Sequence, residues 1–428
     1  MDYVRAIIGL ACLIGFAFLF SEKRKAIDWR LVLTGIILQI VFGLLITQVT
    51  FVKNGFNWVS AQFVTLLGFS EDGASFLFGG LINPDSIGFV FALQVLPTVI
   101  FFSTVTTGLY YLGVLQVIVK GIAWVMARSM RLSGAEALST AGNIFLGQTE
   151  APLLVRPFVP KMTKSELMCL MTGGMATIAG GVLAGYVTFL GGNDPAEQER
   201  FAVYLLSASI MNAPAAIVMA KIIMPELNRD NINTDLKVSS GSMGANLIDA
   251  LASGAAEGLK LALNIGAMLL AFIALIAALN YVLGAIGALL GLNELITLAT
   301  NGTFDGLSIE YLLGQIFRVF AWIIGVSWEE SLAVGSLLGQ KVTVNEFVAY
   351  LGLSEMVGAG VLSQKSIVIS TYALCGFANF SSIAIQIGGI GGMAPSQQSN
   401  ISRLGLRALL AATIATMMTG TIAGALMV

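Results

Sequence analysis

The sequence predicts an all-α integral membrane protein. Of its 428 residues, 57% are hydrophobic and only 11% are charged, and the mean hydropathy is +0.87. Water-soluble domains carry about 25% charged residues because a hydrated surface requires them. Too few charges remain here to cover a soluble particle, so we expect lipid to contact much of the surface.

Eight segments are apolar and long enough to be read as membrane-spanning helices, which need about 20 residues. They lie at about 6–20, 31–52, 86–119, 167–193, 202–220, 261–293, 366–402 and 408–428. The first is followed by basic residues and by no cleavage site, so we expect it to be retained. The segment 366–402 is too long for one upright helix and rich in glycine, which favours a helix broken in its middle.

Basic residues predict the orientation of the spans. Lys23, Arg24, Lys25 and Arg30 follow the first span and place this connection in the cytoplasm by the positive-inside rule. Alternation then puts most other basic connections inside and both termini outside. This arrangement suits eight spans in a multi-pass protein of a bacterial inner (plasma) membrane.

Two further segments, 133–160 and 307–347, are moderately apolar yet carry carboxylates and glycines in their middles. Each begins and ends on one side of the membrane if there are eight spans, so each is predicted to be a re-entrant hairpin. Such irregular backbone is tolerated at membrane depth only where protein or a watery cavity surrounds it. Each hairpin precedes two spans, which predicts an inverted repeat of 133–222 and 307–428 with a site at the midplane.

The first hairpin carries the run Asn143 to Pro152, with the sequence NIFLGQTEAP. Gly147 loosens the helix, and Pro152 disfavours helical geometry at the preceding residue. A buried charge is costly in a bilayer, so Glu150 is expected to have a partner or to face water. It therefore marks a site for a polar solute or, in the alternative reading, packs helices by pairing with Arg156.

The second repeat carries carboxylates at Glu329, Glu330 and Glu346. Adjacent residues of a helix point about 100° apart, so Glu330 can face a cavity while Glu329 reaches the outer surface or Lys341. Glu346 lies near the start of span 7 and is open to a purely structural reading.

Spans 4 and 7 both carry small polar residues among glycines. Asn379 and Ser382, three apart in span 7, share a helix face. Glycine pairs flank Thr177 in span 4, which favours either close helix packing or local unwinding.

Several functions are excluded or disfavoured. The chain has no histidine, so Ser-His-Asp catalysis and most zinc sites are absent. Cys12, Cys169 and Cys375 lie singly in apolar runs and are expected to be buried, free thiols. Basic residues are scattered, which gives no support for nucleic-acid binding. A membrane enzyme using the carboxylates is a weak alternative, because no nucleophile–base pair or metal cluster is readable.

Three motifs together resemble those of the concentrative nucleoside transporters: GQTEAP at 147–152, NEFVAY at 345–350 and GFANFSS at 376–382. The resemblance covers essentially the whole chain in the short bacterial form. It implies a homotrimer of protomers with eight spans and two opposed hairpins. It also implies a fixed scaffold and a mobile transport part that moves like an elevator.

The resemblance divides the chain into four segments. Residues 1–125 (spans 1–3) and 231–300 (span 6) would form the scaffold. Residues 126–230 (hairpin 1, spans 4 and 5) and 301–428 (hairpin 2, spans 7 and 8) would form two transport repeats.

The resemblance also implies site residues. The nucleobase would contact Gln148, Thr149 and Glu150, while Glu330, Asn379 and Ser382 would bind the ribose hydroxyls. Further surface beside the substrate would come from three apolar side chains, Val182, Leu261 and Phe377.

A coupling sodium ion would be held by side-chain and backbone oxygens of Asn143, Leu146, Thr177 and Ile178, since hard cations prefer oxygen ligands. The family position of Thr177 usually holds serine, and threonine keeps the hydroxyl.

The sequence-based hypothesis is therefore sodium-coupled import of a nucleoside such as uridine. Proton-coupled symport, with Glu150 or Glu330 carrying the proton, is the nearest alternative. Purine or pyrimidine preference is not readable.

Overall fold

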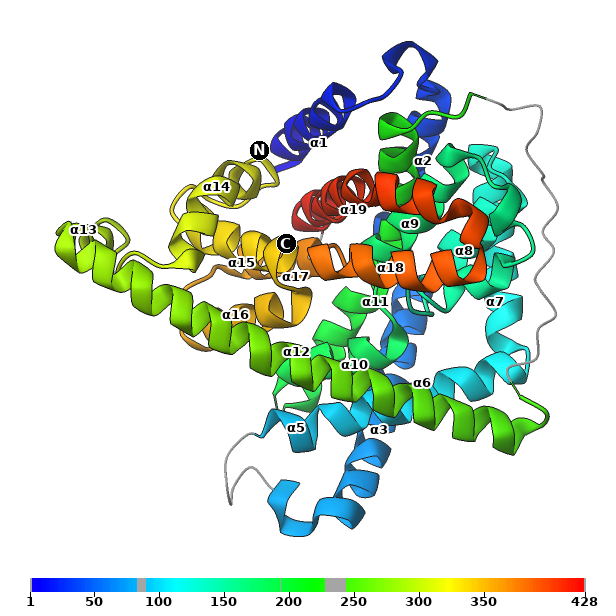
Figure 1. Cartoon of the computed structure of the whole chain (residues 1–428), viewed down its shortest axis with the longest axis horizontal. Helices are drawn as coiled ribbons and strands as arrows, with labels where there is room; N and C mark the ends of the chain where they lie inside the picture. Colours follow the sequence, from blue (N-terminus) through cyan, green and yellow to red (C-terminus); the bar gives the residue numbers. More distant parts are fainter. Residues whose placement is uncertain (1, 83–89, 193, 228–243, 427–428) are drawn as a thin grey trace.

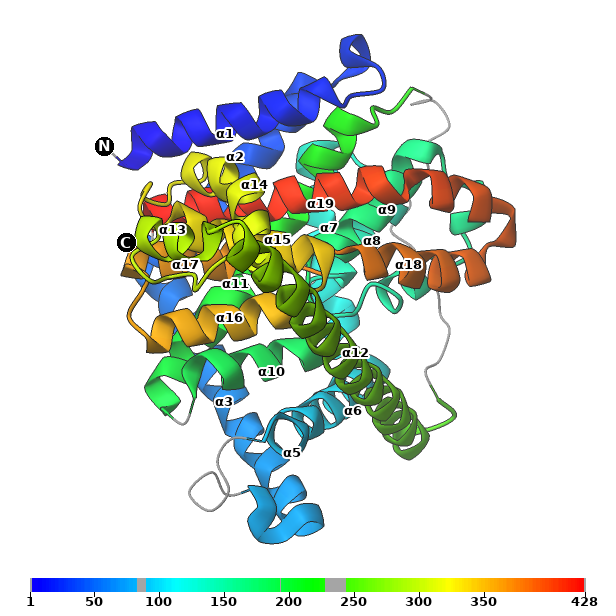
Figure 2. The ribbon, with the colours of Figure 1, turned by 60° about the vertical axis from the view of Figure 1, so that its left-hand side comes forward.

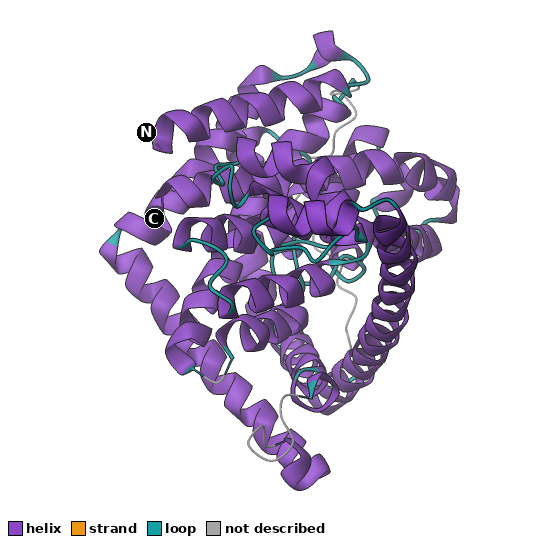
Figure 3. Ribbon diagram, turned by 90° about the vertical axis from the view of Figure 1, so that its left-hand side faces the viewer, coloured by secondary structure: helices purple, strands orange, loops and turns teal. Residues whose placement is uncertain are grey.

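The computed structural model describes residues 2–82, 90–192, 194–227 and 244–426. These residues form helices joined by turns and irregular segments (Figure 1). The longest helix, α12 (Leu247–Leu289), runs diagonally across the other helices (Figure 2). No strand occurs in the described part of the chain (Figure 3). The predicted all-α class is confirmed.

The remaining α-helices are α1 (Asp2–Leu19), α2 (Trp29–Gln48), α3 (Thr50–Phe78), α5 (Phe91–Gln94), α6 (Leu96–Tyr111), α7 (Val114–Met130), α8 (Gly134–Gly142), α9 (Lys164–Ala176), α10 (Gly180–Gly191), α11 (Pro195–Ile223), α13 (Leu292–Ala299), α14 (Ile309–Ile323), α15 (Ser331–Thr343), α16 (Glu346–Gly358), α17 (Gln364–Leu374), α18 (Phe380–Met393) and α19 (Gln398–Leu426). Short 3₁₀ turns are η1 (Arg24–Ala26), η2 (Gly79–Ile82), η3 (Ala151–Val155), η4 (Val159–Lys161) and η6 (Pro395–Gln397).

Seven helical stretches of the described chain are long and apolar enough to cross a bilayer. They are Asp2–Leu19, Trp29–Gln48, Phe91–Tyr111, Lys164–Gly191, Pro195–Ile223, Leu247–Leu289 and Pro395–Leu426. The first six each overlap one predicted span, and Pro395–Leu426 overlaps both 408–428 and the end of 366–402. The remaining predicted span, 366–402, is divided into α17 and α18 by an irregular stretch at residues 375–379. The break expected from its glycine content is confirmed.

The helix α3 was not predicted. The second span was expected to end near residue 52, with a connection after it, but α3 continues for 29 residues from Thr50. Polar residues such as Lys53 and Glu71 recur along it, which lowers its hydropathy below that of a span. Most of its side chains are at least partly exposed.

The core is built from the interrupted helix α9–α10 and from α11, α17 and α19. In the most apolar window of α9–α10, 94% of residues are buried, compared with 17% in α12. Most residues of α1 and α2 are also at least partly exposed. The most buried helices thus all come from the segments predicted to form the transport part, although α14 and α18 of those segments are mostly exposed or partly exposed.

Two interrupted helices meet at the centre of this core. The chain unwinds between α9 and α10 at residues 177–179, so the glycine pairs around Thr177 accompany unwinding. The second interruption, at residues 375–379, lies against the first. The Phe377 amide donates a hydrogen bond to the Thr177 carbonyl (3.3 Å), and Gly376 presses on Ala176 so closely that a Cβ would lie 2.8 Å from its carbonyl carbon.

The predicted second hairpin, 307–347, has a different extent in the structure. The predicted range includes α14 and α15 and ends at residue 347, inside the first turn of a further helix, α16. Helix α16 packs against α15. The Asn345 side chain starts α16 by accepting a hydrogen bond from the Val348 amide (3.0 Å). An N-cap of this kind satisfies a backbone donor at the helix start, so the chain turns at residues 344–345.

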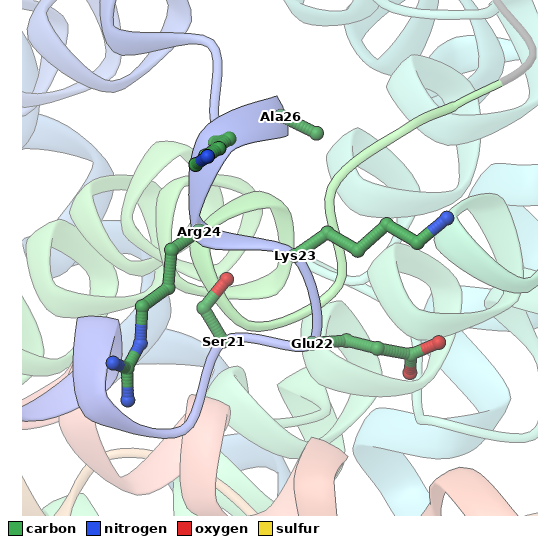
Figure 4. Close-up of a pocket in the computed structure, with 6 residues that line it drawn as sticks. Ser21, Glu22, Lys23, Arg24 and Ala26 are labelled. Carbon is green, nitrogen blue, oxygen red and sulfur yellow. The ribbon is translucent and has the colours of Figure 1, made fainter.

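The connection between α1 and α2 lies at one end of the molecule. The Glu22 amide donates to the Ile223 carbonyl at the end of α11 (2.9 Å), and its carboxylate pairs with Arg407 of α19. Figure 4 shows that the Lys23 and Arg24 side chains of this connection point away from each other beside a shallow hollow. The structure thus brings together basic segments that the sequence assigns to one membrane side.

A buried ion pair joins α8 to α11. The Lys221 ammonium contacts the Glu136 carboxylate, and both side chains are buried. Glu136 also accepts from the Ser133 amide (3.1 Å) in a capping box that starts α8, while Lys221 donates to the Ser165 hydroxyl (2.9 Å). The pair therefore ties three elements of the core together.

We expect Lys221→Met to lower the free energy of unfolding by about 3–5 kcal/mol, because Glu136 is left as an uncompensated buried charge. The double change Lys221→Met with Glu136→Leu should recover most of the loss. Thermal unfolding of the detergent-solubilised protein measures both. The exposed ion pair of Glu22 and Arg407 is the control, since Arg407→Gln should lower the free energy of unfolding by less than about 1 kcal/mol. Equal effects of the two single changes would contradict this assignment.

We expect Gly376→Ala to destabilise the fold by at least about 1–3 kcal/mol. Its φ of +146° is strained for other residues, and the added Cβ would meet the Ala176 backbone. Gly388→Ala is the matched control, because nothing lies within 4 Å of its added Cβ and alanine favours the helix α18. Unfolding midpoints in detergent test the pair, and an unchanged midpoint for Gly376→Ala would refute the close contact of the two breaks.

Candidate functional site

A cavity of about 1030 Å³ lies between the interrupted helices and α12. Eight of the nine predicted substrate residues line it: Gln148, Thr149, Glu150, Val182, Leu261, Phe377, Asn379 and Ser382. They come from the loop after α8, from α10, from α12, from the break before α18 and from the first turn of α18. Segments more than 200 residues apart in the sequence therefore converge on one space.

The loop after α8 connects to α18 through side-chain amides. Gln148 donates to the Ser382 hydroxyl (3.0 Å) and accepts from the Gln386 amide (3.1 Å). Gln386 also donates to the Met171 carbonyl of α9 (3.0 Å). Gln386 was not predicted from the sequence, although a lone amide in an apolar, glycine-rich helix is a readable signal of a buried polar partner.

Glu150 belongs to the same loop. Its carboxylate accepts a hydrogen bond from the Gly147 amide (3.1 Å), which closes a tight turn before η3 begins at Ala151. In the described residues it forms no ion pair with Arg156, so the helix-packing alternative lacks its expected contact. Arg156 does line the same cavity. The Glu150 carboxylate thus keeps acceptor capacity for a solute.

Asn379 and Glu346 form a second polar group of the cavity, linked to the first through Ser382. The Asn379 oxygen accepts from the Ser382 amide (2.9 Å) and so caps α18. Its nitrogen donates to the Glu346 carboxylate (2.8 Å), whose other oxygen accepts from the Tyr186 hydroxyl (2.9 Å). Glu346 lies in the first turn of α16, where the helix dipole favours a negative charge.

Glu330 does not lie with these residues, contrary to the prediction. Its carboxylate accepts from the Ser363 amide and from the Ser363 hydroxyl, both at 2.9 Å, at an exposed position. It does not line the cavity. Instead, the turn at residues 344–345 places Glu346 at the cavity. This position was missed because the predicted hairpin, 307–347, extended past that turn. The sequence signal was present in the motif NEFVAY, where an asparagine cap precedes the glutamate.

The four residues predicted to bind an ion also lie close to the breaks. Asn143 is fully buried, and neither its amide oxygen nor its amide nitrogen has a hydrogen-bond partner. The Thr177 hydroxyl donates to the Gly173 carbonyl (2.8 Å), and a Cβ on Gly173 would lie 3.4 Å from the Asn143 nitrogen. Leu146 and Ile178 are joined to the same region by a bond from the Gly180 amide to the Phe145 carbonyl (3.1 Å).

A buried amide without partners is uncommon, because its desolvation is costly. An oxygen ligand set built from amide, hydroxyl and carbonyl groups suits a hard monovalent cation. In the described residues, no group of three or more His, Cys, Asp or Glu side chains gathers at a possible metal site. The residues present therefore fit sodium better than a transition metal.

Four polar residues of α12 face the cavity: Ser253, Glu257, Lys260 and Asn264. Their spacing of four, three and four residues places them on one face of the helix. The cavity is therefore polar on the α12 side as well, where only Leu261 was predicted from the sequence. Its charged lining residues are three carboxylates (Glu150, Glu257 and Glu346) and two cations (Arg156 and Lys260).

Comparison with known proteins identifies the family. Models described as "Na+ dependent nucleoside transporter" match residues 8–81 (N-terminus) and 204–424 (C-terminus), and one described as "Nucleoside recognition" matches 92–193. An "Uncharacterized transporter YutK" of Bacillus subtilis is 42% identical over 99% of both chains. The mouse "Sodium/nucleoside cotransporter 1" is 38% identical, over 98% of this chain and 63% of its own.

Solved structures agree with this family. The transporter CNTnw, in an inward-facing substrate-bound state, is 39% identical with a TM-score of 0.88, covering 100% of this chain and 98% of that chain. A double variant of CNTnw in an outward-facing state is 38% identical with a TM-score of 0.90 and the same coverage. The resemblance inferred from the three motifs is confirmed. This chain belongs to the concentrative, sodium-dependent nucleoside transporter family, whose members are multi-pass membrane transporters and not enzymes.

Proposed function

We propose that this protein imports nucleosides by sodium-coupled symport across a plasma membrane, in bacteria the inner membrane. One observation carries the proposal. Two carboxylates, Glu150 and Glu346, reach a single cavity from separate interrupted-helix units, and a buried, unpartnered Asn143 lies in the same unit as Glu150.

The two polar groups suit the two halves of a nucleoside. Gln148, Thr149 and Glu150 offer donors and acceptors to the edge of a nucleobase such as uracil. Glu346, Asn379 and Ser382 offer acceptors to vicinal ribose hydroxyls, with Glu346 taking the role first assigned to Glu330. Apolar surface beside the substrate comes from Val182, Leu261 and Phe377.

The sodium ligands are Asn143 and Thr177 through their side chains, together with backbone carbonyls of Leu146 and Ile178. The unpartnered Asn143 oxygen supports this assignment. The bond between Gly180 and Phe145 supports it further, because it holds the loop after α8 against the first break. Cation binding would order that loop, which also carries the base-binding residues.

We also propose eight spans, with α17–α18 forming the interrupted seventh. The first re-entrant hairpin is built from α8 and η3, and the second is α15–α16 in place of α14–α15. The two repeats are then alike, because each consists of a hairpin, an interrupted helix and a 29-residue helix, α11 or α19. This likeness supports the inverted repeat.

The transport part comprises 126–230 and 301–428 and moves like an elevator past the scaffold of 1–125 and 231–300. The exposed apolar side chains of the peripheral helices are available for lipid and for contacts in a homotrimer. The polar face of α12 would be the scaffold wall past which the substrate travels. Structures of CNTnw in inward- and outward-facing states support alternating access as the general mechanism.

The coupling ion is tested by uptake of labelled uridine into proteoliposomes. An inward sodium gradient should drive accumulation, and Asn143→Ala should abolish this stimulation because the amide oxygen ligand is lost. Asn400→Ala is a matched control, since this asparagine is bonded to Gln397, away from the cavity. Accumulation driven by a pH gradient in sodium-free buffer would favour proton coupling, and no uridine transport would refute the substrate class.

The ribose contacts are tested by comparing two carboxylates. Glu346→Gln should lower kcat/KM for uridine by about 10- to 150-fold, the value of about 1.5–3 kcal/mol typical of a hydrogen bond to a charged group. Glu330→Gln should change it less than twofold, because this carboxylate bonds Ser363 outside the cavity. The reverse order of effects would restore Glu330 as the ribose residue.

A further inference from the structure

A single buried side chain bridges the two helix breaks. Asn212 lies in α11 and is completely buried. Its amide nitrogen donates to the Ala176 carbonyl (2.8 Å) and to the Cys375 carbonyl (2.8 Å). Ala176 ends α9 and Cys375 follows the last residue of α17. These carbonyls have no partner within their own helices, because a helix end leaves its last carbonyl groups unsatisfied.

The bridged carbonyls belong to the two proposed binding sites. Ala176 directly precedes Thr177 and Ile178, the ion-site residues of the first break. Cys375 lies two residues before Phe377 and four before Asn379, the nucleoside-site residues of the second break. One planar NH₂ group, with its two hydrogens in fixed directions, is thus shared between the ion site and the nucleoside site.

The arrangement is not the one that stability alone would favour. The Asn212 oxygen is buried with no hydrogen-bond partner, and such a group costs free energy. Pro214, two residues on, has no amide hydrogen, so α11 also lacks a helical hydrogen bond here. The middle of α11 therefore carries two unfavourable features, an unpaired amide oxygen and a missing helical hydrogen bond. We attribute the presence of Asn212 to the two hydrogen bonds that its nitrogen donates.

Resting on the proposed function, we infer that Asn212 is a positioning residue that couples sodium binding to nucleoside binding. Ligation by Thr177 and Ile178 fixes the backbone of the first break. The shared amide then holds the Cys375 carbonyl, and with it the start of the second break, in the conformation that presents Phe377 and Asn379. Coupling is reciprocal, so the nucleoside strengthens sodium binding through the same amide.

The coupling is measured as a ratio of uridine dissociation constants, in sodium-free choline buffer and in saturating sodium, by calorimetry on the full-length protein in detergent. In the wild type we expect a ratio of at least about fivefold, the low end for allosteric coupling. Asn212→Leu has a similar size and no hydrogen-bond donor, and its ratio should fall below about twofold. Asn212→Ser keeps one donor and should give an intermediate ratio.

The matched control is Ser207→Ala. Ser207 is a buried polar residue of the same helix. Its hydroxyl lies 2.5 Å from the hydroxyl of Tyr372, in the last turn of α17, and hydrogen-bonds neither of the two bridged carbonyls. Its loss should leave the ratio unchanged. A residue with a merely structural role would weaken binding equally in both buffers, so a folded Asn212 variant with the wild-type ratio overturns the inference alone. A wild type without any sodium effect overturns the proposed coupling and this inference together.

Discussion

The structure depends on satisfying backbone groups that two interrupted helices leave free inside the protein. A break at membrane depth is tolerated only where protein or a watery cavity surrounds it. Here the two breaks are hydrogen-bonded to each other, because the Phe377 amide donates to the Thr177 carbonyl. The Asn212 amide of α11 donates to one further carbonyl at each break. Because Gly376 has no side chain, the two backbones can approach to contact. The cavity, its capping asparagine and the proposed ion site all depend on this crossing.

Much of this could be predicted from the sequence, because hydropathy and glycine content report directly on burial and on helix interruption. The break in 366–402 follows from such local patterns, whereas the eight predicted substrate residues that line the cavity follow from the family resemblance of three motifs. The position of Glu346 could not be predicted in the same way. It depends on a single turn at residues 344–345 inside an apolar stretch, and a shift of that turn exchanges which carboxylate faces inward. The helix α3 was missed because polar residues interrupt its hydropathy while leaving helix propensity intact.

The contrast between core and periphery has an energetic basis. Close packing and internal hydrogen bonds hold the central helices together, since lipid supplies little hydrophobic force between helices. The buried pair of Lys221 and Glu136 and the amide ladder of Gln148 and Gln386 supply such bonds. α12 has few buried residues and can lie at the edge because its own helix satisfies its backbone. Its polar face adds side-chain chemistry to the cavity without a break.

The charge of the cavity has a metabolic consequence. Three carboxylates and two cations line it, so a ligand with further negative charge meets net repulsion in surroundings that screen charge poorly. A phosphate ester carries about two negative charges at neutral pH. In the proposed function, a kinase that phosphorylates an imported nucleoside would make a product that this cavity disfavours. Phosphorylation would therefore help to retain the nucleoside in the cell.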